Sequence, residues 1–389
     1  MTHVHNFGAG PSVLPPEVME QVQREMLDFA GTGMSVLEVS HRSRPFDQVV
    51  NDAEARVRDL LGVPATHSVL FVQGGATTQF AAVWYNLLAS QVVRSRFPAG
   101  TPAPPADYLV TGTWSRKAAE EVTRLGGRVN VAFDAAQSPS TGRAYIGVPP
   151  TAEWQTTGPR SRDAAYVYYC DNETVNGVEW DAVPDVHPDT VLVCDISSNA
   201  MSRPIDVARF GIIFAGAQKN MGPAGVTVVI VRNDLLVRAG PDHPYVPFPT
   251  MLDYEVARAH RSLYNTPPTF AIYVCDLVFK WIQERGGVAG MAERSQAKLA
   301  ALTPVLDGST LYRCPVAARY RSRMNVVLTL TRPELEAAFL AGAQKRGMVQ
   351  LKGHRSVGGI RISLYNALDL ASVQALAAYM VDFEREHTT

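Results

Sequence analysis

A single lysine, Lys219, lies in a short segment that joins two apolar runs of the sequence. The runs, 212–214 and 226–231, have the composition of buried strands, and the residues between them are mostly small or turn-forming. A solvated lysine needs no such surroundings, whereas an amine held at a strand end can react with a carbonyl group. Taken alone, the pattern is more typical of a surface turn, so its interpretation depends on other residues.

Three further features come at or just beyond the ends of predicted strands. They are the carboxylate of Asp195, the indole of Trp114, and the stretch 74–78 (GGATT), which opens a predicted helix. Ligands of open α/β sheets bind beyond the carboxyl ends of the strands. We therefore expect these groups to lie close to Lys219.

Pyridoxal phosphate (PLP) is a cofactor that needs this combination of groups. A lysine forms a Schiff base with it, a carboxylate keeps its pyridine nitrogen protonated, an aromatic side chain stacks on its ring, and helix N–H groups bind its phosphate. Each feature alone has a common structural explanation, such as a helix cap for the aspartate or core packing for the tryptophan. Their joint occurrence at strand ends favours a PLP site.

Strands and helices alternate through the first two thirds of the chain. Strands are predicted over 68–73, 107–112, 127–133, 164–170, 190–195, 211–216 and 225–232. Helices are predicted over 16–29, 47–61, 76–90 and 115–125. Because the strands are apolar throughout, we expect an α/β fold with a mostly parallel central sheet covered on both faces.

The pattern changes after a Pro-rich stretch at 241–249. A long helix over 269–283 is followed by another helix, a strand at 323–330, a helix over 333–346, a strand at 360–365 and a last helix ending at 386. We interpret this part as a smaller C-terminal α/β domain. The expected division is a large domain over 16–268 and a small domain over 269–389 that includes the N-terminal residues 1–15.

The composition argues against several classes of protein. With 389 residues, 46% of them hydrophobic, and a net charge of −1, the chain can form a large core and has no basic tract for nucleic acid or an anionic membrane. Its four cysteines form neither a CxxC pair nor a metal-binding spacing, so we expect no metal and a reducing compartment. No apolar run could span a bilayer and no signal segment is evident, so we expect a cytoplasmic protein. Neither GxGxxG after the first sheet strand nor GxxxxGK[ST] is present, which disfavours dinucleotide and P-loop folds.

Ten stretches resemble the class V PLP-dependent aminotransferases, and within this family the branch that makes O-phospho-L-serine. They are NFGAGPSVLPPEV, SVLEVSHRS, GGATTQF, GTWSRKA, CDNETVNGVE, CDISSNAMSRPID, FAGAQKNMGPAGVTVVIVR, NTPPTF, RMNVVLTL and LKGHRSVGGIRISLYN. The resemblance runs from about residue 6 to residue 386. It implies the PLP-dependent aminotransferase fold, known as fold type I.

The resemblance also implies roles at the cofactor ring. Lys219 would be the Schiff-base lysine and proton shuttle, and Asp195 would pair with the pyridinium nitrogen. Trp114 would stack on the ring, and Thr174 would hydrogen-bond its phenolic oxygen.

Further residues are implied for the cofactor phosphate. Ala76, Thr77 and Gln218 would bind it from the same chain. Asn265 and Thr266 would reach it from the other subunit, so the active form would be a homodimer.

The implied reaction exchanges an amino group between L-glutamate and 3-phosphohydroxypyruvate, giving 2-oxoglutarate and O-phospho-L-serine on the route to serine. The same enzyme would also act on the related four-carbon compound, in the 4-phosphohydroxythreonine step of PLP biosynthesis. By similarity, His41, Arg42, His354 and Arg355 would bind the substrate phosphate and Arg361 the α-carboxylate. From residue types alone, the two His-Arg pairs could equally lie on solvated surfaces, and Arg361 could pair with an acid.

The sequence departs from the family at two places and leaves alternatives open. Some members have Arg where Thr77 stands, and some have Ser where Ala9 stands, so a charge and a hydroxyl are missing here. The alternatives within class V are an alanine–glyoxylate aminotransferase and a cysteine desulfurase, for which Cys314 is the candidate cysteine. The alternative from another class is a binding protein that kept the fold without catalysis.

Overall fold

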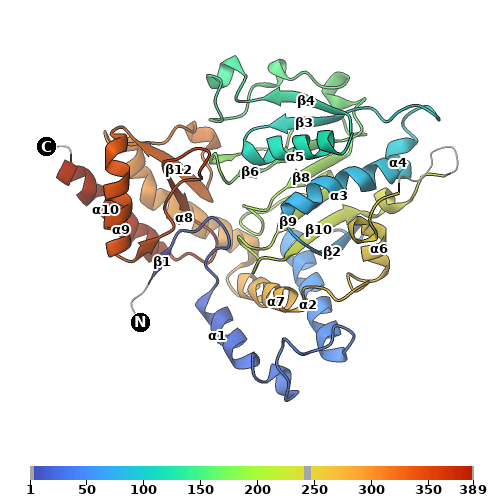
Figure 1. Cartoon of the computed structure of the whole chain (residues 1–389), viewed down its shortest axis with the longest axis horizontal. Coiled ribbons are helices and arrows are strands. Elements are labelled where there is room, and N and C mark those ends of the chain that lie inside the picture. The colour runs from blue at the N-terminus through green and yellow to red at the C-terminus, as the bar shows by residue number, and fades with distance from the viewer. Residues whose placement is uncertain (1–3, 241–246, 388–389) are drawn as a thin grey trace.

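A seven-stranded sheet forms the centre of the larger part of the molecule (Figure 1). The structure is a computed structural model and describes residues 4–240 and 247–387. Strand order is β2-β10-β9-β8-β5-β3-β4. The bounds are β2 His67–Gln73, β3 Ala106–Val110, β4 Val129–Asp134, β5 Val167–Cys170, β8 Leu192–Asp195, β9 Ile212–Gly216 and β10 Val226–Arg232.

All strands of this sheet run parallel except β10, which is antiparallel to both β2 and β9. The prediction of a mostly parallel α/β sheet is therefore confirmed. The carboxyl ends of the six parallel strands meet at one edge of the sheet, where ligands bind in folds of this type. The observed strands β5 and β8 begin three and two residues later than predicted, because bends at Ala164, Ala165 and Thr190 precede the paired residues.

The apolar strands are buried on both faces, and successive residues face different cores. On β2 and β10, Phe71 and Val228 belong to one hydrophobic cluster, whereas Leu70 and Val229 belong to the other. This alternation is the two-residue period of a strand. It explains why these segments are apolar throughout rather than alternating.

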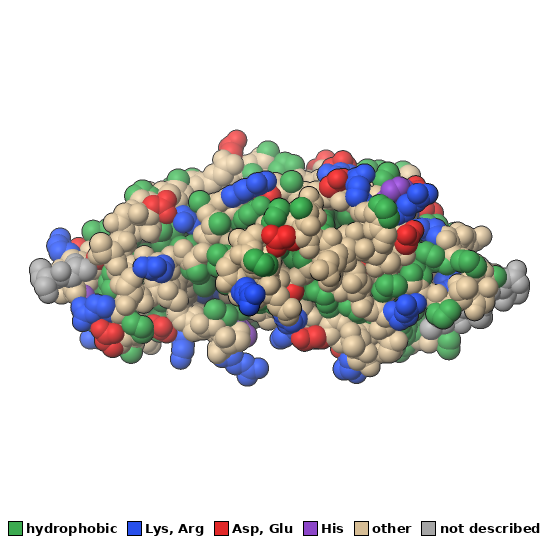
Figure 2. Space-filling model, turned by 90° about the horizontal axis from the view of Figure 1, so that it is seen from above, with side chains coloured by type: hydrophobic (Ala, Val, Ile, Leu, Met, Phe, Trp, Pro, Cys, Tyr) green, Lys and Arg blue, Asp and Glu red, His purple; other side chains and the backbone are tan. Residues whose placement is uncertain are grey.

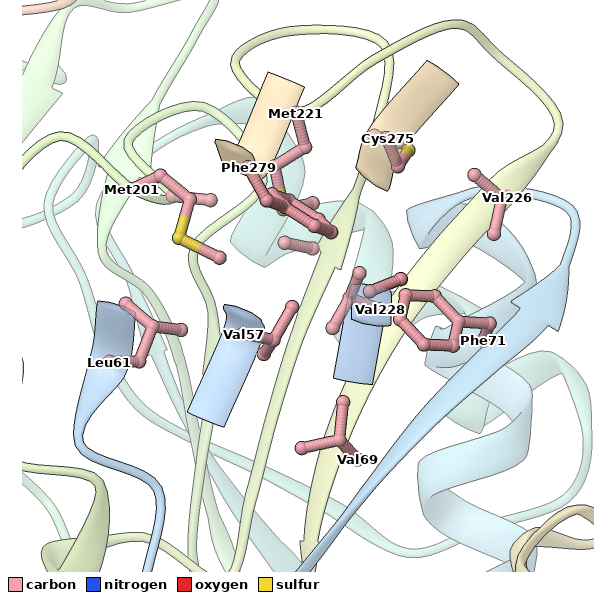
Figure 3. Packing of buried hydrophobic residues seen from close by; sticks show 14 of the residues in the cluster. Val57, Leu61, Val69, Phe71, Met201, Met221, Val226, Val228, Cys275 and Phe279 are labelled. Carbon is pink, nitrogen blue, oxygen red and sulfur yellow. The ribbon is translucent and has the colours of Figure 1, made fainter. Parts of the chain in front are cut away.

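Helices cover both faces of the sheet. Helices α2 (Arg44–Leu61) and α7 (Thr269–Gln283) pack together over one face, where Val57, Leu61 and Phe279 meet the strand side chains (Figure 3). Helices α3 (Ala76–Ala89) and α5 (Thr113–Arg124) contribute to the core of the other face. Shorter helices are α1 Pro16–Glu25, α4 Gln91–Arg94 and α6 Tyr254–Ala259.

A three-stranded sheet of order β11-β12-β14 forms the C-terminal part. Its strands are β11 Tyr312–Arg313, β12 Asn325–Leu330 and β14 Ile360–Ser363, and its helices are α8 Gly287–Gly308, α9 Glu336–Lys345 and α10 Leu370–His387. The N-terminal strand β1 (His5–Asn6) pairs in parallel with β13 (Met348–Val349), so the start of the chain joins this part. Phe7 lies in its hydrophobic core.

The division of the chain at residue 269 stays a prediction, and the packing of α7 bears on it. The apolar side chains of α7 lie in the same cluster as those of α2, beneath the large sheet. Along α8, Met291 still belongs to this cluster, whereas Leu302 belongs to the C-terminal core. We therefore propose a boundary inside α8. The Pro-rich stretch 241–249 lies mostly outside the described residues.

The surface charge and the helices relate to the expectation that the protein binds neither nucleic acid nor a membrane. On the face drawn in Figure 2, basic and acidic side chains are interspersed with hydrophobic ones, in agreement with the net charge of −1. None of the helices in the described part of the chain combines the length and apolar character needed to cross a bilayer.

Candidate active site

Lys219 lies just beyond the end of β9, in the turn that leads to the antiparallel strand β10. Its Nζ atom donates a hydrogen bond to Thr174 Oγ1 at 2.7 Å and lies 5.9 Å from the centre of the Trp114 ring. Burial lowers the pKa of the Lys219 amine, while Asp195 opposes this shift. A lowered pKa increases the fraction of neutral, nucleophilic amine.

Asp195 is the last residue of β8, the strand next to β9 in the sheet. It is only 3% exposed, and its Oδ1 accepts a hydrogen bond from the backbone N–H of Ser197 at 2.8 Å. Burial raises the pKa of the Asp195 carboxyl, and Ser197 and Lys219 oppose the shift. A carboxylate in these surroundings is well suited to hold a proton on a nearby ring nitrogen.

Glu173 fixes the start of helix α5, and with it the position of Trp114. Its carboxylate accepts hydrogen bonds from the backbone N–H of Trp114 at 2.8 Å and of Ser115 at 2.9 Å, and from Ser115 Oγ at 2.5 Å. A Cβ atom on Gly112 would lie 2.5 Å from the carboxyl carbon of Glu173, so only glycine fits there. The sequence predicted a role for Thr174 but none for its neighbour Glu173.

Tyr365 and Asn325 connect the site to the C-terminal part, and both were missed from the sequence. The Tyr365 hydroxyl donates to the backbone oxygen of Ala9 at 3.0 Å and accepts from Asn325 Nδ2 at 3.2 Å. Asn325 Oδ1 in turn accepts from Asn172 Nδ2 at 2.9 Å. The sequence signal that could have indicated them is that Asn325 lies in the stretch RMNVVLTL and Tyr365 in the stretch LKGHRSVGGIRISLYN.

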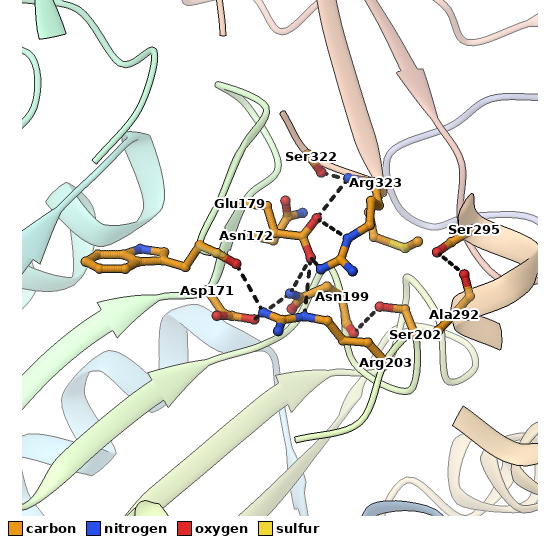
Figure 4. A network of polar contacts seen from close by, with 12 residues as sticks. Asp171, Asn172, Glu179, Asn199, Ser202, Arg203, Ala292, Ser295, Ser322 and Arg323 are labelled. Atoms are coloured by element: carbon orange, nitrogen blue, oxygen red, sulfur yellow. Dashed lines mark hydrogen bonds and ion pairs between the residues drawn. The ribbon is translucent and has the colours of Figure 1, made fainter. Parts of the chain in front are cut away.

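A buried ionic network next to the site links the same two parts of the molecule (Figure 4). Arg323 Nη2 donates to Glu179 Oε1 at 2.7 Å, and the backbone N–H of Arg323 donates to Glu179 Oε2 at 2.8 Å. Arg203 bridges Glu179 and Asp171, with N···O distances of 3.4 and 2.5 Å. The pairs thus hold the chain just after α8 and β11 against the loop that follows β5.

The start of helix α3 has the features of an anion site. Gly74 has a positive φ of 97°, and a Cβ on Gly75 would meet no atom within 4 Å, so open space lies before the helix. The helix start carries no side-chain cap, which leaves the N–H groups near Ala76 and Thr77 for a ligand. Gln218, next to Lys219, is partly buried.

Asn265 and Thr266 lie at the same end of the sheet. Gln73 Nε2 donates to the backbone oxygen of Thr266 at 3.0 Å, which fixes this segment beside the end of β2. Within the described residues, neither the Asn265 nor the Thr266 side chain forms a hydrogen bond. Both are therefore open to another molecule.

Three basic residues of the C-terminal part are His354, Arg355 and Arg361. The pKa of His354 is lowered by burial and by the charges of Arg361, Lys117 and Arg355, so each of these three charges lies near the imidazole. Arg361 also lowers the pKa of Lys219. In residues 4–240 and 247–387, Arg361 forms no ion pair with Asp or Glu. The alternative that Arg361 only pairs with an acidic residue of the protein is therefore not supported.

His41 and Arg42 precede helix α2. Among the residues that the structure describes, no hydrogen bond, ion pair or ring contact joins them to Lys219 or Trp114. Arg42 is exposed, and the Nε2 atom of His41 is buried without a hydrogen-bond partner. The structure of one chain therefore does not bring these two residues into the site.

Cys314 does not have the surroundings of a reactive cysteine. It is partly buried, and burial raises the pKa of its thiol, which disfavours the thiolate. The described residues also contain no group of three or more His, Cys, Asp or Glu side chains that could hold a metal ion.

The residues present fit PLP. The Trp114 Nε1 atom is buried without a hydrogen-bond partner, and its ring lies beside the Lys219 amine. The carboxylate of Asp195 and the open start of α3 supply the partners that the ring nitrogen and the phosphate of PLP require.

Comparisons with known proteins agree with this arrangement. The family model "Aminotransferase class-V" matches residues 4–376. The phosphoserine aminotransferase of Azotobacter vinelandii is 49% identical over 98% of both chains. The solved phosphoserine aminotransferase of Bacillus circulans subsp. alkalophilus is 42% identical, covers 99% of both chains and has a TM-score of 0.88. A further solved phosphoserine aminotransferase, described by the radiation damage of its Schiff base, is 38% identical, with a TM-score of 0.89, and the match covers 99% of this chain and all of that one. The chain therefore belongs to the class V aminotransferase family, in the branch of the phosphoserine aminotransferases.

Proposed function

We propose that this protein transfers an amino group from L-glutamate to 3-phosphohydroxypyruvate, giving 2-oxoglutarate and O-phospho-L-serine, with PLP bound covalently at Lys219. The observation that carries the proposal is the cluster of Lys219, Thr174, Asp195 and Trp114 at one edge of the sheet, with a Lys219 Nζ to Thr174 Oγ1 distance of 2.7 Å. The high identity to phosphoserine aminotransferases supports the choice of substrate.

Each residue of the cluster has a task in amino transfer. When bound, PLP supplies an electron sink that lets a proton leave the substrate Cα. Lys219 moves that proton, since burial gives its amine a lowered pKa. Asp195 holds a proton on the ring nitrogen, Trp114 supplies the stacking surface, and Thr174 donates to the phenolic oxygen.

The anionic groups of cofactor and substrate account for the remaining residues. Ala76, Thr77 and Gln218 hold the cofactor phosphate at the start of α3. Arg361 binds the substrate carboxylate as a bidentate pair, since it has no acidic partner among the described residues. His354 and Arg355 bind the substrate phosphate. The same role stays a prediction for His41 and Arg42, which no contact among the described residues of one chain brings to the site.

We further propose a homodimer in which Asn265 and Thr266 complete the cofactor site of the other subunit. Their side chains make no hydrogen bond in the described part of their own chain. Large apolar side chains are also exposed along residues 19–37, including Leu27 (84% exposed) and Leu37 (57% exposed). Apolar surface of this kind often marks an interface between subunits.

The test is an absorbance spectrum of the purified protein before and after adding L-glutamate, followed by an assay of amino transfer. We expect a bound chromophore that glutamate converts, and transfer to 3-phosphohydroxypyruvate far faster than to glyoxylate. Borohydride reduction and peptide mapping should place the label on Lys219, and Lys219→Ala should lose both the chromophore and turnover. Faster transfer to glyoxylate, or a label on another residue, would contradict the proposal.

A further inference from the structure

Lys117 is a cation of helix α5 that the roles described so far leave unexplained. It follows Trp114 by one helical turn, is exposed, and its Nζ atom lies 4.9 Å from the centre of the Trp114 ring. The same ring lies 5.9 Å from Lys219 Nζ. The ammonium of Lys117 therefore borders the surface on which the cofactor ring would stack.

Lys117 also faces the C-terminal part of the molecule. Its charge acts on His354, as do those of Arg361 and Arg355, and all three lower the pKa of that imidazole. Lys117 of the large sheet region and Arg355 and Arg361 of the C-terminal part thus all lie near the His354 imidazole, and Lys117 also borders the Trp114 ring. They come from different elements and meet only through the fold.

The charge of this group is not balanced by the protein. Within the described residues, Lys117, Arg355 and Arg361 form no ion pair with Asp or Glu. One carboxylate would neutralise only Arg361, so the remaining charges suit a ligand with a second, doubly charged group.

We propose that Lys117 is a specificity-determining residue that binds the phosphate group of a phosphorylated 2-oxo acid, or of the matching amino acid, together with His354. This inference depends on the proposed function and names a further contact for its substrate. It also supplies a charge that the stretch 74–78, which contains no Arg or Lys, does not provide.

The experiment compares Lys117→Gln with Lys345→Gln, a control that removes the same charge from an exposed position of α9. In the PLP-loaded enzyme, we expect Lys117→Gln to raise the KM for 3-phosphohydroxypyruvate about tenfold, the effect of one charge-assisted hydrogen bond. The KM for L-glutamate should change less than twofold, and Lys117→Arg should recover most of the loss. The control should match the wild type.

A second measurement does not depend on turnover. In the cofactor-free protein, we expect NMR titration to give a higher His354 pKa in Lys117→Gln than in the wild type, because one repelling charge is gone. A role of Lys117 in supporting only the Trp114 ring would instead weaken both substrates equally. That result, or an unchanged KM for the phosphorylated substrate in an enzyme whose wild type performs the transfer, would overturn the inference and leave the proposed function intact.

Discussion

At the scale of single residues, Asp195 allows a clear separation between a contribution to the reaction and a contribution to the stability of the fold. It is 3% exposed, and burial raises its pKa, so the fold gains little from its charge. The hydrogen bond that Asp195 Oδ1 accepts from the Ser197 N–H could be accepted equally well by the side-chain oxygen of an asparagine. The charge at this position therefore serves the site rather than the fold.

We predict that Asp195→Asn lowers kcat by about 100-fold, as expected when a buried electrostatic partner is lost. The midpoint of thermal unfolding should stay close to that of the wild type, because shape and hydrogen bond are kept. Steady-state rates and a thermal melt of the two proteins check this. A variant with near-native kcat would mean that Asp195 does not hold the proton on the ring nitrogen.

A candidate site residue could be predicted only where nearby residues in the sequence indicate its position. Lys219, Asp195 and Trp114 follow strands directly, so sequence order alone indicates where they lie. Glu173 and Asn325 could not be recognised, because their roles arise from contacts over 59 and 153 positions along the chain. The role that we propose for Lys117 was also not predicted, because a helix-surface lysine is usually solvated.

At the scale of elements, helix α5 depends on a residue outside it. Glu173 is fully buried and accepts three hydrogen bonds, from the backbone N–H groups of Trp114 and Ser115 and from the Ser115 hydroxyl. Glu173 thereby caps the N-terminus of α5, where its negative charge also interacts favourably with the helix dipole.

We predict that Glu173→Gln destabilises the protein by about 1–3 kcal/mol, because its NH₂ group cannot accept a hydrogen bond and leaves a buried donor unpaired. Denaturant unfolding measures this loss. Glu121→Gln on the same helix is the control, since Glu121 forms only a surface pair with Arg124 that contributes little. Equal stabilities of the two variants would show that Glu173 is not the cap on which α5 depends.

Helix α8 is joined to the segment after β14 by Lys298, which is 2% exposed. Its Nζ donates to the backbone oxygens of Leu364 at 2.7 Å, Tyr365 at 2.5 Å and Leu368 at 3.2 Å. The Asn366 N–H of this segment also donates to Asn220 Oδ1 at 2.9 Å, and Asn220 follows Lys219 in the chain. Burial lowers the pKa of Lys298 to about 7.

This pKa gives a pH dependence with a definite sign. Above pH 7 the folded lysine is neutral while the unfolded lysine stays protonated to about pH 10, so the unfolded chain binds more protons and stability rises with pH. Relative to Lys298→Met, we predict that the wild-type free energy of unfolding rises by about 1 kcal/mol per unit between pH 7 and 9. If the free energies of unfolding of the wild type and Lys298→Met changed in parallel with pH, the three carbonyl oxygens would keep the Lys298 ammonium charged.

At the scale of the whole molecule, the sequence predicted the two α/β parts but not what joins them. The alternation of elements and the resemblance indicated both, while the Glu179–Arg323 pair spans 144 positions and left no local signal. The packing of helix α7 likewise leaves no local signal, since only the fold places its apolar side chains beneath the large sheet. Long-range pairing is the information that residue patterns carry least.

The proposed assembly can be tested by mixing two inactive variants. If Asn265 and Thr266 serve the other subunit, a dimer of one Lys219→Ala chain and one chain with Asn265→Ala and Thr266→Ala has one site with every residue intact. After unfolding and refolding together in equal amounts, random pairing should restore about a quarter of the wild-type activity. Each variant refolded alone is the control. If the three residues instead served the same chain, every dimer would contain only damaged sites, and the mixture would be no more active than its components.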